Sequence, residues 1–283
     1  MNKVTKRLLV FFIGIPIVIG IVSLYYYNYI AMNILAVVAS AFGANEFFNM
    51  ASKKVKMFPK TLVIIFTAAL PFLAYNFILL DLDLSNLTWV MVIEIFVFMG
   101  AEALFSKSFE ESIIKISLTV LIIFYTGFMI TFVTRLTSIK QNATIFIYLY
   151  FILVFMCDSG AWLFGVLFGK STRGVFAASP NKSLVGFAGG ILGSVLMGLL
   201  YKVIFPSIIT TSYPKLIALG FITALSAVIG DLIESVFKRS CEVKDSGNLI
   251  PGRGGALDCL DSLILGAPIY YIGIHFLYLT AKI

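Results

Sequence analysis

The chain has 283 residues, 60% of them hydrophobic, and a mean hydropathy of +1.02. This composition excludes a water-soluble globular protein, because apolar runs long enough to cross about 30 Å of hydrocarbon recur from end to end. The net charge of +7 does not indicate nucleic-acid binding, since the cations lie in short clusters between the apolar runs. The three cysteines have no CxxC spacing and no neighbouring histidine, which argues against a zinc site.

The apolar runs predict an all-α integral membrane protein of about nine transmembrane helices, forming one polytopic domain over residues 1–283. The N-terminal helices occupy residues 1–142, and residues 143–283 hold the helices and loops that suit catalysis. In chain order the predicted helices cover residues 8–25, 29–50, 60–80, 87–105, 112–134, 143–168, 184–205, 215–237 and 261–281. Residues 25–28 are a weak break between the first two.

The seventh helix has small residues at a spacing that favours close helix packing in lipid: Gly186, Gly189, Gly190, Gly193, Ser194 and Gly198.

The distribution of Lys and Arg predicts the orientation, because cytoplasmic segments carry an excess of these residues. With the N-terminus in the cytoplasm and the C-terminus outside, only five of the 21 cations fall on the outer side: Arg135, Lys140, Lys202, Lys215 and Lys282. The same orientation places the most polar stretch, residues 235–261, in the cytoplasm, where nucleotides and Mg²⁺ are available.

Two pairs of carboxylates lie at the ends of this polar stretch. Asp231 and Glu234 come near the end of the eighth predicted helix, and Asp258 and Asp261 come where the ninth begins. Each pair has i, i+3 spacing, so adjacent helices would bring four carboxylates together. Such oxygen ligands suit Mg²⁺ with a bound phosphate compound. The alternative is salt bridging to the cations nearby, Lys238, Arg239 and Lys244, but so many charges at a membrane edge favour a functional site.

Between the pairs, the chain is too rich in glycine to be helical. Its segments Lys244-Asp245-Ser246-Gly247 and Pro251-Gly252-Arg253-Gly254-Gly255 can present successive N–H groups to phosphate oxygens, although ordinary turns look similar. Upstream, Asp158 lies inside the sixth apolar run without a local cation, so a helix–helix hydrogen bond and a substrate contact both remain open. Glu46, Glu94 and Glu102 belong to no such cluster and are expected to be structural.

At this point the residues resemble a known family. SVFKRSCEVKDSGNLIPGRGGALDCLDS is similar to the signature of phosphatidate cytidylyltransferases, also called CDP-diacylglycerol synthases. The matching positions are Ser235, Lys238, Arg239, Lys244, Asp245, Pro251, Gly254, Gly255, Asp258 and Asp261. CDSGAWLFGVLFGK, SPNKSLVGFAGG and GDLIES resemble three upstream motifs of the family, in the same order, whereas the first half matches only as apolar spans. The sequence departs from the family pattern at three positions, with Arg253 for His, Cys259 for Arg and Val185 for Glu or Gln.

The resemblance implies a membrane-embedded nucleotidyltransferase that makes CDP-diacylglycerol and pyrophosphate from CTP and phosphatidate in phospholipid biosynthesis. It implies Mg²⁺, with room for a second cation, and a multi-pass location in the cell (inner or plasma) membrane. Metal ligands are expected at Asp231 and Asp258, with Asp261 and Asp245 around them or at the second cation. The residues expected to contact substrates are Asp158, Ser179, Lys182, Ser235, Lys238, Arg239, Lys244, Arg253, Gly254 and Gly255. The expected partners are both substrates and membrane lipid, and a homodimer is compatible with the sequence.

Three alternatives compete with this interpretation. A divergent, weakly active relative could use another phospholipid or CDP-alcohol substrate. A phosphotransferase acting on CDP-alcohols would need a longer series of aspartates, of which only Asp258 and Asp261 are present. A secondary transporter would show an inverted repeat with paired broken helices, and the first half contains no second polar stretch like residues 235–261.

The charge distribution predicts that Cys241 and Cys259 lie on the cytoplasmic side. An impermeant thiol reagent should therefore leave both unlabelled when it is added outside intact cells. Labelling from outside would contradict the predicted orientation.

Overall fold

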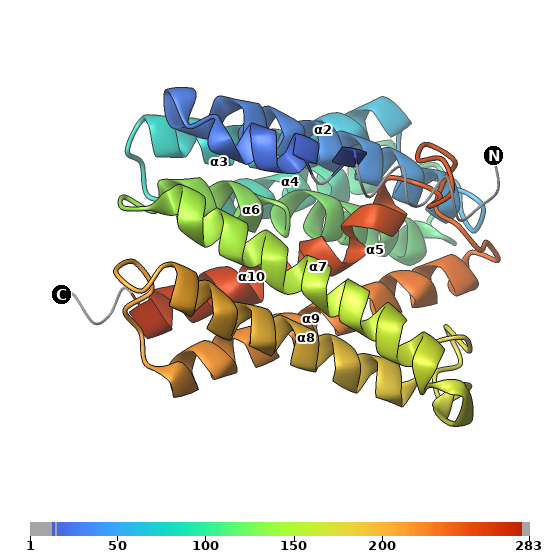
Figure 1. Cartoon of the computed structure of the whole chain (residues 1–283). Coiled ribbons are helices and arrows are strands. Elements are labelled where there is room, and N and C mark those ends of the chain that lie inside the picture. Colours follow the sequence, from blue (N-terminus) through green and yellow to red (C-terminus); the bar gives the residue numbers. More distant parts are fainter. Residues whose placement is uncertain (1–12, 15, 279–283) are drawn as a thin grey trace. The chain divides into compact units, whose positions relative to one another are not determined.

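The computed structural model describes residues 13–14 and 16–278, and this part of the chain is helical (Figure 1). Within it no named strand occurs, and only two isolated bridges, between Arg173 and Ser183 and between Ile250 and Gly254, have β-type pairing. The chain folds into two compact units. Unit 1 comprises residues 1–138 and 240–260, and unit 2 comprises residues 139–239 and 261–283.

Unit 1 is a bundle in which α2 packs against α3, and α3 in turn packs against the segment that follows α5. Its elements are α2 (Tyr26–Ala51), α3 (Lys60–Leu79), α4 (Asn86–Phe105), α5 (Ser112–Ile122), the π-helical turn η1 (Ile123–Phe128), α6 (Thr131–Arg135) and the 3₁₀ turn η2 (Leu136–Ser138). The sequence predicts one regular helix over residues 112–134, whereas the structure contains a π turn inside it. At this turn Gly127 lies against α3, where a Cβ atom would come within 2.8 Å of the Thr67 carbonyl oxygen.

Unit 2 is built on the pairing of α7 (Ala143–Leu167) with α8 (Leu184–Ile204), which lie side by side in Figure 1. The 3₁₀ turn η3 (Lys170–Thr172), α9 (Tyr213–Ser240) and α10 (Leu257–Tyr278) complete the set of helices, with the ends of α9 and α10 falling in unit 1. The predicted small-residue packing of the seventh helix is confirmed. A Cβ atom on Gly190 would lie 2.7 Å from the Cys157 carbonyl oxygen, so only glycine allows this approach.

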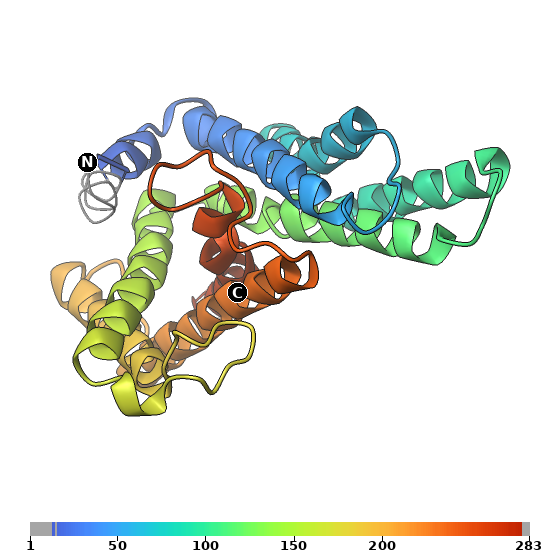
Figure 2. The same ribbon diagram turned by 90° about the vertical axis from the view of Figure 1, so that its right-hand side faces the viewer.

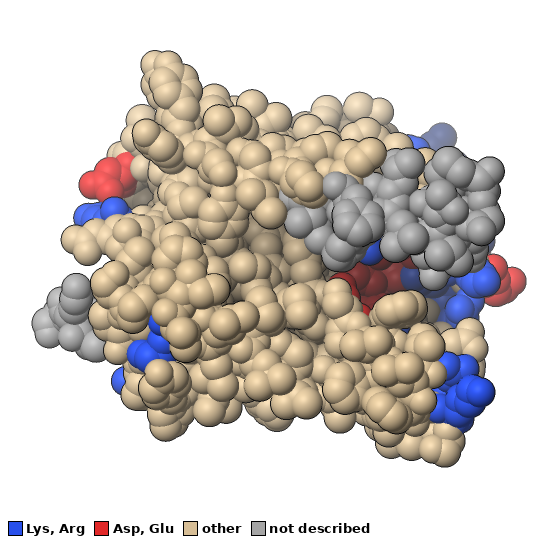
Figure 3. Space-filling model, viewed as in Figure 1, with Lys and Arg blue, Asp and Glu red and all other residues tan. Residues whose placement is uncertain are grey.

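Eight helical segments of the described chain are long and apolar enough to cross a membrane. Their outer faces carry large apolar side chains, such as Trp89 at 68% and Leu104 at 77% exposure. In Figure 3 the visible faces of the helices are almost wholly tan, and Lys, Arg, Asp and Glu gather towards the two sides of the view. A surface of this kind is stable in lipid and costly in water. The protein is therefore a multi-pass membrane protein.

The predicted helices correspond to the observed ones, with differences at the ends. The first prediction, residues 8–25, lies partly outside the described residues, and residues 16–23 of it are helical. The break predicted at residues 25–28 is present, because Tyr27, Asn28 and Tyr29 all have positive φ. Helix α10 begins at Leu257, four residues before the predicted start at Asp261, so Asp258 and Asp261 both belong to it. The predicted end at residue 281 lies outside the described residues.

The close approach of α7 and α8 gives a stability prediction. A Cβ atom on Gly160 would lie 2.6 Å from the Gly189 carbonyl oxygen, whereas Gly100 of α4 has open space around it. Gly160→Ala should therefore lower the free energy of unfolding by about 1–3 kcal/mol, as overpacking does. Gly100→Ala is the matched control and should be neutral or slightly stabilising. Thermal unfolding in detergent measures both, and equal melting temperatures would contradict the close packing.

Candidate functional site

The polar loop, residues 241–256, forms a compact turn in unit 1. In Figure 2 it is the orange-red loop beside the blue helix α2. Ile250 N donates to the Gly254 carbonyl at 2.7 Å, and Gly254 N donates back to the Ile250 carbonyl at 3.0 Å. Gly254 has a φ of +112°, which side-chain-bearing residues rarely adopt. The loop thus needs glycine at residue 254 for its backbone shape, and the N–H expected to bind phosphate already donates within the turn.

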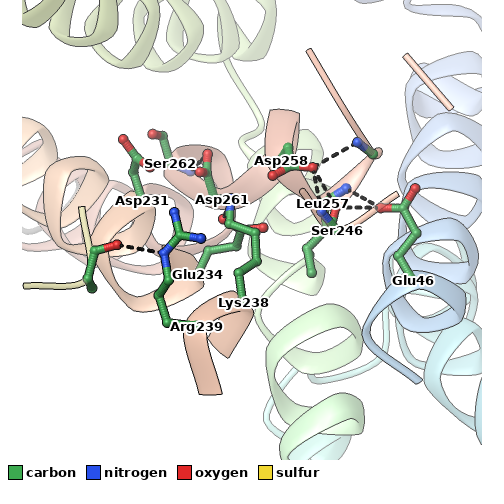
Figure 4. A network of polar contacts seen from close by, with 12 residues as sticks. Glu46, Asp231, Glu234, Lys238, Arg239, Ser246, Leu257, Asp258, Asp261 and Ser262 are labelled. Carbon is green, nitrogen blue, oxygen red and sulfur yellow. Dashed lines mark hydrogen bonds and ion pairs between the residues drawn. The ribbon is translucent and has the colours of Figure 1, made fainter. Parts of the chain in front are cut away.

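Asp258, in the first turn of α10, holds the two ends of the polar loop together. Its Oδ2 accepts hydrogen bonds from Ser246 N, Ser246 Oγ and Gly255 N, each at 2.8 Å (Figure 4). The Gly255 N–H, like that of Gly254, is therefore used inside the loop. Asp258 is expected from the sequence as a metal ligand, and the structure adds that one of its oxygens organises the loop.

A second attachment joins the start of the polar loop to the turn after α2. Lys54 Nζ lies 2.7 Å from Glu242 Oε1, and this hydrogen bond lowers the pKa of Glu242 below its usual value. Both side chains are exposed, so the pair contributes little to stability. A pocket of about 200 Å³ lies between the end of α2 and the loop, with Lys53 and Asp245 in its wall.

Unit 2 collects four carboxylates from three helices. Asp158 comes from α7, Asp231 and Glu234 come from α9, and Asp261 comes from α10. Asp261 is 7% exposed, and the charges of the other three act on it. Ser262 N donates to Asp261 Oδ1 at 2.6 Å, and Ser262 Oγ donates to Asp158 Oδ1 at 3.2 Å. Three of the four were predicted from the sequence as functional residues, and the structure brings them together.

Glycine permits this convergence, because α9 and α10 touch through backbone. A Cβ atom on Gly230, next to Asp231, would lie 2.6 Å from the Asp261 carbonyl oxygen. The glycine of the GDLIES motif therefore sets the separation of the two helices that carry most of the acidic side chains.

Three cations expected to bind phosphate are placed around these carboxylates. Lys182 Nζ lies 2.6 Å from Asp231 Oδ2, and Lys238 forms an ion pair with Glu234, whose side chain is fully buried. Arg239 Nε donates to the Ala178 carbonyl at 3.2 Å (Figure 4). Lys182 thus acts first as the partner of the half-buried Asp231. Lys238 is the partner of the buried Glu234, which removes part of the cost of burying either charge alone.

The chemistry of this group fits a divalent cation. Carboxylate and hydroxyl oxygens are the ligands that Mg²⁺ prefers, and the four acids outnumber the two lysines that form ion pairs with them, Lys182 and Lys238. No three His, Cys, Asp or Glu side chains converge as ready-made metal ligands among the residues described here. In unit 2, Lys182 Nζ lies beside the Asp231 oxygen that a cation would share.

The remaining predicted residues lie in several places. Ser235 is buried on α9, and Ser179 lies in the turn where Lys182 N donates to its carbonyl at 3.1 Å. Lys244, Asp245 and Arg253 are exposed on the polar loop. Cys259, which stands where the family signature has Arg, is half-buried in the first turn of α10. Asp245 and Arg253 thus face solvent within unit 1.

Comparison with known proteins agrees with this set of motifs. Residues 5–277 match the cytidylyltransferase family. The chain belongs to that family. Relatives named phosphatidate cytidylyltransferase include those of Staphylococcus epidermidis strain ATCC 35984 (36% identical over 146 residues, 52% of this chain and 53% of the relative) and Bacillus subtilis strain 168 (32% over 148 residues, 52% and 54%). That of Staphylococcus aureus strain COL is 37% identical over 148 residues, 52% of this chain and 53% of the relative. The chain spans about half the length of the curated relatives it matches.

Sequence reasoning missed one residue of the polar-loop network. Glu46, expected to be merely structural, is 5% exposed and accepts hydrogen bonds from the polar loop and from the start of α10. The sequence did contain one indication of its role, because Glu46 is an acid in an apolar run with no cation nearby in the sequence. Nothing in the sequence indicates that its donors lie about 200 residues further along the chain.

The buried pair of Glu234 and Lys238 gives a prediction about stability. Lys238→Met should destabilise the protein by about 3–5 kcal/mol, because it leaves the Glu234 carboxylate buried without its lysine. Glu234→Gln together with Lys238→Met should recover most of the loss. Thermal unfolding of both variants measures this, and an unchanged melting temperature in Lys238→Met would contradict the stabilising role of the ion pair.

Proposed function

We propose that the protein transfers the cytidylyl group of CTP to phosphatidate, giving CDP-diacylglycerol and pyrophosphate. The observation that carries the proposal is the group of carboxylates in unit 2, Asp158, Asp231 and the buried Asp261, with Lys182 ion-paired to Asp231. Charged side chains inside membrane-spanning helices are costly and mark sites for ionic substrates. Membership in the cytidylyltransferase family and the names of its relatives support the same substrates.

The reaction needs the two anionic substrates to be neutralised and aligned. A phosphate oxygen of phosphatidate attacks the α-phosphorus of CTP, and the bond from that phosphorus to the oxygen bridging to the β-phosphorus breaks. Pyrophosphate leaves with the bonding electrons. A phosphate oxygen is already a competent nucleophile near neutral pH, so positioning and charge stabilisation carry most of the catalysis.

The residues of unit 2 suit this task. Lys182 and Arg239 can turn from their present partners, Asp231 and the Ala178 carbonyl, towards incoming phosphates. Asp231 and Asp261 would then hold a divalent cation, which Asp158 would support through Ser262. When bound, Mg²⁺ supplies neutralisation of the phosphate oxygens and of the leaving pyrophosphate. Asp258 remains a proposed ligand from the sequence, through the oxygen that does not hold the polar loop.

The proposed location of the site is the cytoplasmic side of the membrane. The excess of Lys and Arg in alternate connecting segments supports it, because such segments remain in the cytoplasm. CTP is made in that compartment and cannot cross a lipid bilayer, whereas phosphatidate reaches the site from within the membrane.

The test is an assay of the purified full-length chain in mixed micelles. We expect CTP to be consumed only when phosphatidate is present, with one pyrophosphate released for each CDP-diacylglycerol formed. Chelation should abolish turnover, and added Mg²⁺ should restore it. CTP hydrolysis without phosphatidate, or a folded protein inactive with both substrates, would overturn the proposal.

The Asp258→Asn variant removes the charge of this side chain while keeping an oxygen that can accept the hydrogen bonds of the loop. The amide oxygen can still accept from Ser246 and Gly255, so the melting temperature should change little. Turnover should fall at least about tenfold, since losing one interaction with the metal costs about 1.4 kcal/mol or more of transition-state stabilisation. Glu110→Gln, at an exposed acid, is the control and should keep wild-type turnover.

A further inference from the structure

Glu46 occupies an unusual position for an acidic residue. It lies on α2, a helix apolar enough to cross a membrane, and only 5% of it is exposed. Transferring a carboxylate from water to such a place costs several kcal/mol unless hydrogen bonds replace its hydration. The partners of Glu46 therefore show what it does.

Two of these partners form the start of α10. Ala256 N donates to Glu46 Oε1 at 2.9 Å. Leu257 N donates to Glu46 Oε2 at 2.8 Å (Figure 4). The first N–H groups of any helix have no partner within the helix, and the positive end of the helix dipole lies there. Glu46 thus caps α10 from a different helix, and it explains why α10 starts at Leu257 rather than at Asp261.

The third partner connects Glu46 to Asp258. Ser246 Oγ lies 3.0 Å from Glu46 Oε2 and 2.8 Å from Asp258 Oδ2. A hydroxyl has one proton to donate, so its position between two acceptors depends on both carboxylates. We therefore expect a displacement of Glu46 to alter the hydrogen bond between Ser246 and Asp258.

Glu46 also explains why two positions of the polar loop are glycine. A Cβ atom on Gly247 would lie 2.5 Å from Glu46 Oε1, and one on Gly255 would collide with Glu46 Oε2 and Ser246 Oγ. The loop backbone closes directly over the Glu46 carboxylate at both positions. The absence of side chains there follows from this close approach.

We infer that Glu46 is a positioning residue for the proposed cytidylyltransferase reaction. It fixes the polar loop and the first turn of α10, and through Ser246 it fixes the direction of Asp258. The hydrogen bonds of Glu46 go to the polar loop and to the start of α10, so its proposed effect on the reaction is indirect. The inference rests on the proposed function only for its effect on turnover, because the anchoring of the loop can be measured separately.

The anchoring is tested by limited proteolysis of the full-length protein. Trypsin can cleave after the exposed residues Lys244 and Arg253 of the polar loop. Initial cleavage rates at these two sites should rise at least about fivefold in Glu46→Ala and less in Glu46→Gln, which keeps one acceptor oxygen, because cleavage follows local opening. Glu94→Gln is the matched control, since Glu94 is equally buried on α4, and its rates should equal those of the wild type.

Turnover distinguishes a positioning role from a purely structural one. At a temperature well below unfolding, kcat should fall about tenfold in Glu46→Gln, while KM for phosphatidate stays within about twofold of wild type. Ser246→Ala should lower kcat, and combining it with Glu46→Gln should add little, since both act through the same hydrogen bonds.

The outcomes separate this inference from the proposed function. Wild-type kcat and wild-type cleavage rates in Glu46→Gln would overturn the positioning role. This holds even if the melting temperature of the variant is lower, because a purely structural role would account for that change. A wild-type protein without cytidylyltransferase activity would refute the proposed function. The cleavage rates would still show whether Glu46 holds the loop.

Discussion

The cost of placing charge inside membrane-spanning helices governs the structure of this protein. Three buried acids have partners that lower this cost. Glu234 pairs with Lys238, and Glu102 accepts from Ser112 at 2.5 Å and lies 2.6 Å from Lys115. Glu46 uses the N-terminus of α10 instead of a cation. The partners of Glu102 and Glu46 come from other helices of unit 1, whereas Glu234 and Lys238 lie one turn apart on α9.

The signature glycines of the polar loop have a geometric role. Gly254 has a backbone conformation that other residues avoid, and Gly255 lies over Glu46 where no side chain fits. The N–H groups of both residues donate to the loop itself and to Asp258. A glycine-rich motif in a phosphate enzyme thus need not be a phosphate cradle. Here its first role is to form a compact turn that presents exposed residues such as Arg253.

The two lysines beside the acids of unit 2 connect stability with the proposed chemistry. Lys182 and Asp231 neutralise one another at 2.6 Å, so the site can fold without substrate or metal. Binding a cation at Asp231 would release Lys182, and its charge would then be available to a phosphate. The same groups therefore satisfy the folded state and suit the reaction, which is how a membrane protein can keep several charges at low cost.

The sequence by itself determined the all-helical membrane class, because spans of about 20 apolar residues have few other stable forms. It also indicated Asp158, Asp231 and Asp261 as functional, since ionisable residues stand out within apolar runs. It could not show the π turn at Ile123–Phe128, which depends on the approach of Gly127 to α3. Nor could it assign Glu46 to the polar loop or start α10 at Leu257. Both depend on hydrogen bonds between residues about 200 positions apart, and only the tertiary structure brings such residues together.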